Sequence, residues 1–114
     1  IFLAFGHPEG FGLPMAEALA CGCALVGYSG LGGKELFDSS EFHSVGAEIP
    51  FGDWVGFVRA CRAIDSSLLH QRFEMLQALL QTSKAVRQLY SPSMMNRSVQ
   101  IALRRWESQL SSSA

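Results

Sequence analysis

The chain of 114 residues is long enough for one domain with a single hydrophobic core and too short for two. Hydrophobic residues make up 48% of it and charged residues 17%, which excludes a disordered chain. The net charge of -1 gives no electrostatic reason to expect nucleic acid or an anionic membrane as a partner. A small anionic ligand remains open, because backbone amides can bind phosphate.

The N-terminal part has the pattern of a strand, a loop, a helix and a second strand. The apolar run Ile1–Phe5 predicts a strand buried on both faces, and the glycines and proline of residues 6–12 predict a loop. Pro14 suits the first turn of a helix that Gly22 would end, and Ala24–Val26 predicts a second buried strand. Such a βαβ unit normally has parallel strands joined by a right-handed crossover.

The middle of the chain predicts shorter elements. A second glycine-rich loop covers residues 29–33, and a short helix is expected over residues 34–37. One or two short strands are expected around Val45 and Ile49. Asp53 is a plausible N-cap for the helix that follows.

The C-terminal half predicts amphipathic helices, because its apolar residues recur at helical spacing. The first stripe comprises Trp54, Phe57, Val58 and Cys61; the second comprises Leu68, Leu69, Phe73, Leu76 and Leu80; the third comprises Met95, Val99, Ala102, Leu103, Trp106 and Leu110. Ser91 and Pro92 are typical of the N-cap and first position of the last helix, whose tail from Ser111 should fray. We interpret the stripes around Trp54, Leu69 and Trp106 as core packing.

The cysteines and the N-terminus say little about chemistry. Cys21, Cys23 and Cys61 are odd in number and lack the spacing of a disulfide framework. No His or Cys cluster follows Cys21 and Cys23 at metal-ligand spacing, so we interpret these two as small thiols of the core. The chain starts with an apolar run and has neither a Met nor a basic segment there, so no signal peptide is predicted. We expect the chain to begin inside a strand of a larger protein.

Candidate ligand-binding residues gather in the first loop. In open parallel sheets ligands bind beyond the carboxyl ends of the strands, and this loop leaves such an end and enters a helix N-terminus. Gly10 and Gly12 would let a ligand approach the backbone closely. Glu9 and Glu17 frame the loop, and carboxylates there suit ribose or sugar hydroxyls, since an ionised carboxylate only accepts hydrogen bonds. We expect Glu9 and Glu17 to face one open cleft.

These residues form a recognisable pattern. The segment Glu9-Gly-Phe-Gly-Leu-Pro-Met-Ala-Glu17-Ala-Leu-Ala-Cys-Gly22 resembles the E-x7-E signature of retaining GT-B glycosyltransferases, the glycosyltransferase group 1 family (family 4). The following Ala-Leu-Val-Gly and Leu-Gly-Gly-Lys-Glu35 resemble the next strand of that family and its G-G-x-E loop. The resemblance covers roughly the first third of the chain well, and the helical remainder fits in outline.

The resemblance implies a fold, an activity and roles for individual residues. The fold would be α/β and Rossmann-like, a short parallel sheet with flanking helices, with residues 1–114 as part of a C-terminal donor-binding domain. Glu9 would be the catalytic residue and bind the hydroxyls of the donor sugar. The backbone of Gly10, Phe11 and Gly12 would line the sugar and diphosphate pocket, the Leu13 amide would bind phosphate, and Glu17 would bind the nucleotide ribose.

The family also implies partners. The donor would be a nucleotide-diphospho-sugar, the acceptor stays unidentified, and an N-terminal domain of the same enzyme would complete the active site. Hexosyl transfer with retention, no cofactor, no tightly bound metal and a cytoplasmic location are implied as well, with attachment at the membrane periphery left open. We therefore expect the isolated chain to be inactive in transfer, to expose apolar surface where upstream strands should pair, and to self-associate there.

Some features depart from the family or leave alternatives open. Ala24 stands where the family often has proline, and the second loop is shifted by about a residue. The family's basic pair that neutralises the diphosphate lies earlier in the domain than this chain reaches. A nucleotide-binding or interaction module on a Rossmann-like scaffold, without catalysis, is the alternative. His7 lies beside the loop, but a lone loop histidine is usually solvated and the family has no matching histidine, so we assign it no role.

Overall fold

The computed structural model describes residues 1–7, 10, 12–38 and 46–113. Its elements, in chain order, are β1 (Phe2–Ala4), α1 (Leu13–Ala20), β2 (Leu25–Gly27), α2 (Glu35–Asp38), β3 (Gly46–Glu48), α3 (Trp54–His70), α4 (Arg72–Leu89) and α5 (Pro92–Ser112). The expected βαβ unit is present as β1, α1 and β2. One or two short strands were expected around Val45 and Ile49; β3 lies between these positions, and Val45 itself is outside the described residues.

The three strands form one parallel sheet in the order β1-β2-β3. The central strand β2 is fully buried, as an apolar strand with a neighbour on each side should be. The expectation that β1 is buried on both faces was wrong. Ala4 is buried, but the side chain of Leu3 is 44% exposed, because β1 is an edge strand of the described sheet and has a neighbour on one side alone.

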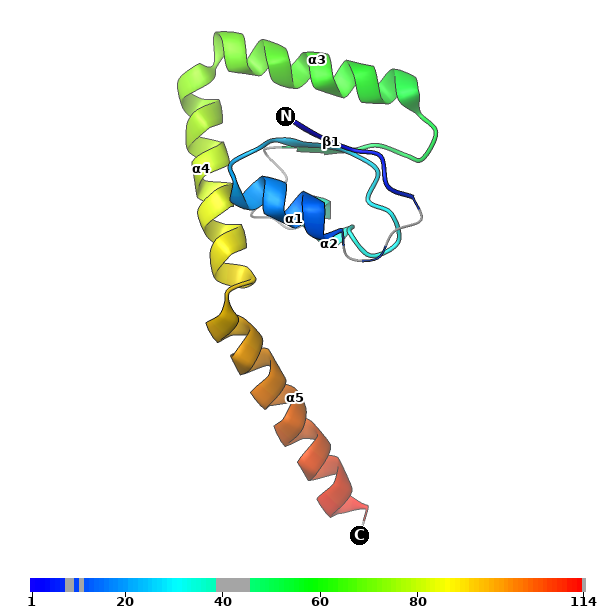
Figure 1. Cartoon of the computed structure of the whole chain (residues 1–114), viewed down its shortest axis with the longest axis vertical. Coiled ribbons are helices and arrows are strands. Elements are labelled where there is room, and N and C mark those ends of the chain that lie inside the picture. The colour runs from blue at the N-terminus through cyan, green and yellow to red at the C-terminus, as the bar shows by residue number, and fades with distance from the viewer. Residues whose placement is uncertain (8–9, 11, 39–45, 114) are drawn as a thin grey trace.

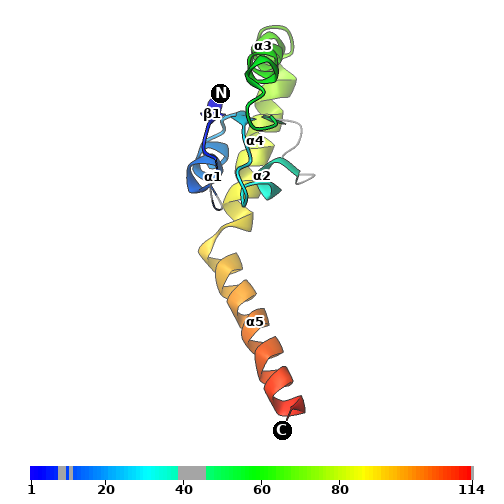
Figure 2. The ribbon, with the colours of Figure 1, turned by 90° about the vertical axis from the view of Figure 1, so that its right-hand side faces the viewer.

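The helices cover the sheet from two sides. In Figure 1, α3 lies above the strands and α1 below them, while α4 runs down the side of the body and contacts both helices. Figure 2 shows the same arrangement turned by 90° about the vertical axis. The residues of the core from the sheet and α1 are Ala4, Met15, Ala16, Leu19, Ala24, Leu25 and Val26; those from the rest of the chain are Leu36, Phe37, Ile49, Phe57, Ile64, Leu79 and Val86.

Helix α1 is held at its C-terminal end by α4. The Ser83 hydroxyl and the Arg87 Nε both donate to the carbonyl oxygen of Ala20, at 2.6 and 2.9 Å. The last carbonyls of a helix have no partner within it, so side chains from another element can satisfy them. This contact joins two helices that are far apart in the sequence and places the groove described below.

Helix α3 begins at the predicted cap, but the boundary between α3 and α4 was not predicted. The Asp53 carboxylate accepts from the Gly56 amide at 2.9 Å and caps α3, as expected. One helix was expected to carry Leu69 and Phe73 together, yet the chain breaks at Gln71 between α3 and α4. Core packing of Trp54 and Leu69 was also wrong: their side chains are 71% and 73% exposed.

Helix α5 projects from the body. Ser91 caps it by accepting from the Met94 amide at 3.3 Å, and Pro92 occupies its first turn, both as predicted. None of its described residues is buried, so the expectation that Trp106 packs in a core was wrong: it is 60% exposed. The helix continues to Ser112 instead of fraying from Ser111.

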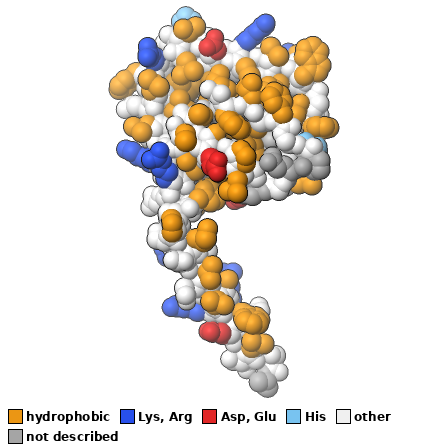
Figure 3. All heavy atoms as spheres, in the orientation of Figure 1, with side chains coloured by type: hydrophobic (Ala, Val, Ile, Leu, Met, Phe, Trp, Pro, Cys, Tyr) orange, Lys and Arg blue, Asp and Glu red, His pale blue; other side chains and the backbone are white. Residues whose placement is uncertain are grey.

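The shape of the molecule reflects this projecting helix. The Cα radius of gyration is 17.3 Å, against about 13 Å for a compact domain of this length. Figure 3 shows apolar side chains scattered over the body and continuing along α5. None of the described helices is sufficiently long and apolar to cross a lipid bilayer.

Candidate functional site

Four of the six residues assigned from the sequence are described by the structure. Glu9, the expected catalytic carboxylate, and Phe11 lie outside the described residues. Gly10 and Gly12 lie in the segment between β1 and α1, here called the glycine loop (residues 6–12). Leu13 opens α1, and Glu17 lies in its second turn.

The start of α1 depends on the backbone of Gly12. This residue is left-handed, with φ of 80° and ψ of 56°, and a Cβ at this position would meet the side chain of Met15. The amides of Met15 and Ala16 donate to the Gly12 carbonyl, and Pro14 has no N–H. The Leu13 amide is therefore a first-turn N–H that no carbonyl of the helix can satisfy. It is available to an anion at the positive end of the helix.

Glu17 lines a groove on the exposed side of α1. The groove has a volume of about 340 Å³ and lies between α1 and the junction of α4 with α5. Its lining residues are Leu13, Ala16, Glu17 and Ala20 from α1, and Val86, Arg87, Tyr90, Ser91 and Pro92 from the other wall. Because Leu13 and Glu17 are one turn apart, the groove extends from the start of α1 along its surface. Glu17 is thus on open surface, as expected, and the half of the cleft that Glu9 should form lies outside the described residues.

The second wall of this groove was not found from the sequence. Tyr90 lies at the α4–α5 junction and lines both this groove and a second hollow of about 320 Å³ that contains Glu35. Burial, and after it the negative charge of Glu35, raise the pKa of the Tyr90 hydroxyl above its ordinary value. Glu17 and Glu35, which belong to the two motifs noted above, therefore each share a hollow with Tyr90. The sequence shows a helix boundary at Tyr90-Ser91-Pro92, but no local pattern indicates that it lies beside α1.

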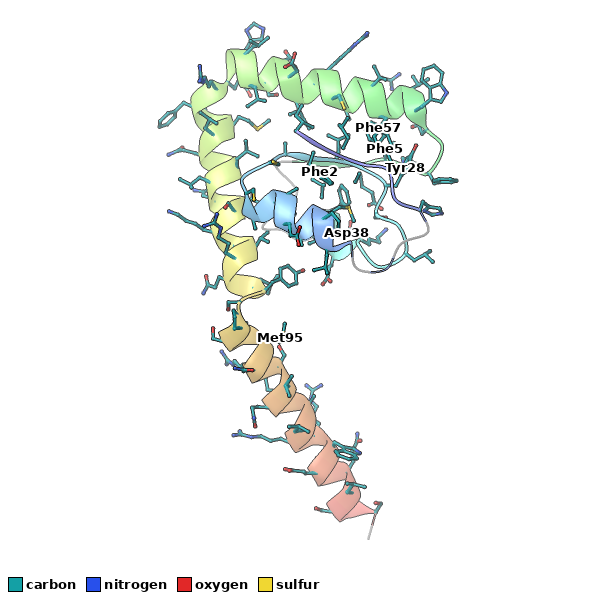
Figure 4. All side chains as sticks on the ribbon, viewed as in Figure 1. Phe2, Phe5, Tyr28, Asp38, Phe57 and Met95 are labelled. Carbon is teal, nitrogen blue, oxygen red and sulfur yellow. The ribbon has the colours of Figure 1, made fainter. Side chains whose placement is uncertain are left out.

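A second group of side chains gathers where the three strands end. The Ser29 hydroxyl, after β2, donates to the Glu48 carboxylate at the end of β3, at 2.6 Å. Beside it lies an aromatic cluster, which comprises Phe5, His7, Tyr28, Phe51 and Phe57. Figure 4 labels three of these rings, Phe5, Tyr28 and Phe57, between the strands and α3. This is the edge at which parallel α/β sheets bind ligands.

Two further kinds of site were considered from the sequence, a metal centre and the cysteines. Within it, no group of three or more His, Cys, Asp or Glu side chains could hold a metal ion. The interpretation of Cys21 and Cys23 as core thiols was wrong for Cys21, which is exposed, whereas Cys23 is half-buried.

Comparison with known proteins identifies no relative: no protein-family model, no curated protein and no solved structure matches the chain. The residues of the motif and the geometry around α1 are therefore the features that indicate a function.

Proposed function

We propose that this chain is the donor-binding part of a retaining glycosyltransferase with a Rossmann-like, GT-B type C-terminal domain. Its ligand would be a nucleotide-diphospho-sugar, and its parent enzyme would transfer a hexosyl group to an acceptor bound largely by another domain. The observation that carries the proposal is the position of Glu17. It lies on the exposed face of α1 and lines a groove that begins at the start of that helix.

The parallel βαβ unit supports this proposal. The glycine loop leaves the carboxyl end of β1 and enters α1, which is where parallel sheets bind phosphates and nucleotides. The Leu13 amide would serve the diphosphate, and Gly10 and Gly12 would let the sugar and phosphate approach the backbone. Glu17 would accept hydrogen bonds from the ribose hydroxyls.

Glu9 would have a different role from Glu17. We assign it to the donor sugar, near the carbon that gains positive charge as the diphosphate leaves. An interaction that strengthens in the transition state raises turnover, whereas a ribose contact that is equal in both states mainly sets donor affinity. This division is the sharpest difference between an enzyme and a nucleotide-binding module without catalysis.

Binding is the first test, since the isolated chain is expected to be inactive in transfer. UDP-glucose and GDP-mannose would be titrated into the chain by NMR and calorimetry, followed by the Glu17→Gln variant. Loss of a charged hydrogen bond should weaken binding by about 1.5–3 kcal/mol, roughly 10- to 150-fold. Glu74→Gln is the matched control, because Glu74 is an exposed carboxylate in the first turn of α4 and is not among the residues lining the groove.

Two outcomes would count against the proposal. One is a chain that binds neither these donors nor free nucleoside diphosphates. The other is equal donor affinity in the Glu17→Gln and Glu74→Gln variants. In the parent enzyme, Glu9→Gln should lower turnover more than donor affinity and Glu17→Gln should do the reverse. Donor binding by a parent enzyme whose turnover is unchanged by Glu9→Gln would favour a binding module over this catalytic assignment.

A further inference from the structure

His7 and Phe51 form an exposed ring stack between two strand ends. Their ring centroids are 4.1 Å apart and their planes differ by 18°. His7 follows β1 and lies in the glycine loop, two residues before Glu9, whereas Phe51 follows β3. The stack therefore joins the segment assigned to the donor with a segment more than forty residues further along the chain.

The backbone that carries Phe51 is held in place on both sides. The Asp53 amide donates to the Pro50 carbonyl at 3.0 Å and closes a turn, in which Gly52 has a φ of +88°. A positive φ at this position of a turn favours glycine strongly. Asp53 then caps α3 through its bond to the Gly56 amide. The Phe51 ring is thus presented by a turn that is tied to a long helix.

Burial of apolar surface does not explain why an aromatic side chain occupies position 51. The side chain of Phe51 is 66% exposed, so little of its apolar surface leaves water. Its ring contacts within the described residues are the stack on His7 and an edge contact with Tyr28, whose ring centroid is 5.3 Å away. Tyr28 in turn contacts Phe57 of α3 at 5.7 Å. A row of rings therefore connects His7 to the core side of α3.

We propose that Phe51 and His7 are positioning residues that hold the entry of the glycine loop against the end of β3. The inference depends on the proposed function for its consequence, which is pre-organisation of the donor site. Glycine loses more backbone freedom than any other residue when its conformation is fixed, and this loop has glycines at positions 6, 10 and 12. Holding one end of it before binding lowers that cost and raises affinity without a direct contact to the donor.

The test separates loop order from donor binding. Backbone amide order parameters of Gly10 and Gly12 would be measured by ¹⁵N relaxation in the ligand-free chain, for His7→Ala, Phe51→Ala and the double variant. UDP-glucose and GDP-mannose affinities would be measured in parallel. Phe73→Ala is the matched control, since it removes a ring that is 71% exposed on α4. His7→Phe keeps a flat ring and should restore the stack.

We expect each single variant to lower the order parameters at Gly10 and Gly12 and to weaken donor binding about two- to tenfold, the usual range for one aromatic pair. The double variant should be no worse than the worse single variant, because both changes remove one contact. Phe73→Ala should resemble the unchanged chain, and so should His7→Phe. A rescue of this kind distinguishes ring stacking from a general loss of folding.

Each contrary result bears either on the positioning role of the two rings or on the proposed function. Unchanged loop order in Phe51→Ala, or loss in the double variant equal to the product of the single losses, overturns the inference. A chain that binds no donor, yet loses loop order in His7→Ala and Phe51→Ala and keeps it in His7→Phe, supports the positioning role and contradicts the proposed function instead.

Discussion

Gly12 and Gly10 belong to the same loop, but only the position of Gly12 requires a residue without a Cβ. Gly12 has a positive φ of 80° and would bring a Cβ against the Met15 side chain, whereas a Cβ on Gly10 would meet nothing within 4 Å. The left-handed conformation costs a residue with a Cβ about 1–2 kcal/mol. At the residue scale, the two glycines are therefore a natural pair of test and control.

We predict that Gly12→Ala lowers the free energy of unfolding by about 1–2 kcal/mol or more, because backbone strain and displacement of Met15 both act. Gly10→Ala should be close to neutral or slightly stabilising, since it restricts the unfolded chain without straining the folded one. Urea denaturation of both variants measures the difference. Equal effects of the two substitutions would contradict the conformation assigned to Gly12.

The hydroxyl of Tyr90 should make the free energy of unfolding decrease at alkaline pH. Its pKa is raised above the ordinary 10.0 in the folded state, first by burial and then by Glu35. A raised folded pKa means that folding favours the protonated hydroxyl. Its contribution to stability is therefore complete below pH 10 and is lost as pH rises through the raised pKa.

We predict that unfolding free energy falls above about pH 10 in the unchanged chain and falls less in Tyr90→Phe, which cannot ionise. In Glu35→Gln the fall should begin at the same pH but be smaller, because removing one of the two causes brings the folded pKa of Tyr90 closer to its unfolded value. Denaturation at closely spaced pH values measures both effects. An alkaline limb that is identical with and without the Tyr90 hydroxyl would refute this account.

At the scale of elements, the packing of α1 against α4 depends on one carbonyl group, that of Ala20. Ser83 and Arg87 both donate to Ala20, near the negative end of the α1 dipole, where a cation is favourable. The same contact holds Arg87 and the residues that follow it beside Glu17. The groove is consequently a product of helix packing, and it depends on side chains that carry no ligand in our proposal.

We predict that Ser83→Ala and Arg87→Ala each lower unfolding free energy by about 1 kcal/mol, the usual net value of one hydrogen bond. The double variant should lose more than the sum of the two, since the Ala20 carbonyl then has neither donor. Arg97→Ala on the surface of α5 serves as the control for loss of a cation. Strict additivity would show that the two donors do not share their acceptor in solution.

At the scale of the whole molecule, the main feature is apolar surface that the chain leaves uncovered. On the edge strand and beside it, Ile1, Leu3 and Phe5 are 48%, 44% and 62% exposed. This confirms the expectation of exposed apolar surface at the opening strand. An unpaired edge with apolar side chains is a template for association with another strand.

We predict that the chain self-associates as its concentration rises, and that Leu3→Lys reduces association because a charge at an edge strand opposes strand pairing. Leu80→Lys on α4 is the control, since Leu80 is also exposed, at 55%. Sedimentation velocity over a range of concentrations measures the effect. A chain that stays monomeric at high concentration, or that responds equally to both substitutions, would contradict association through β1.

Much of the local structure could be predicted from the sequence, because it depends on neighbours in the chain. Asp53 and Ser91 cap helices through amides three residues ahead, and Pro14 stands in a first turn, so short patterns were enough. The parallel pairing of β1 with β2 followed from a rule about connections. The candidate residues Gly10, Gly12, Leu13 and Glu17 were found in the same way, from one contiguous motif.

The tertiary structure decided which apolar stripes are covered and what faces the motif. Helical spacing shows that Trp54, Leu69 and Trp106 recur on helix faces, but whether a face meets another element depends on packing, and these three are exposed. The groove beside Glu17 has a second wall at Tyr90, and the glycine loop is joined to Phe51 by a ring stack. Both contacts connect segments more than forty residues apart, and such pairs are set by how helices and strands pack and not by any local pattern.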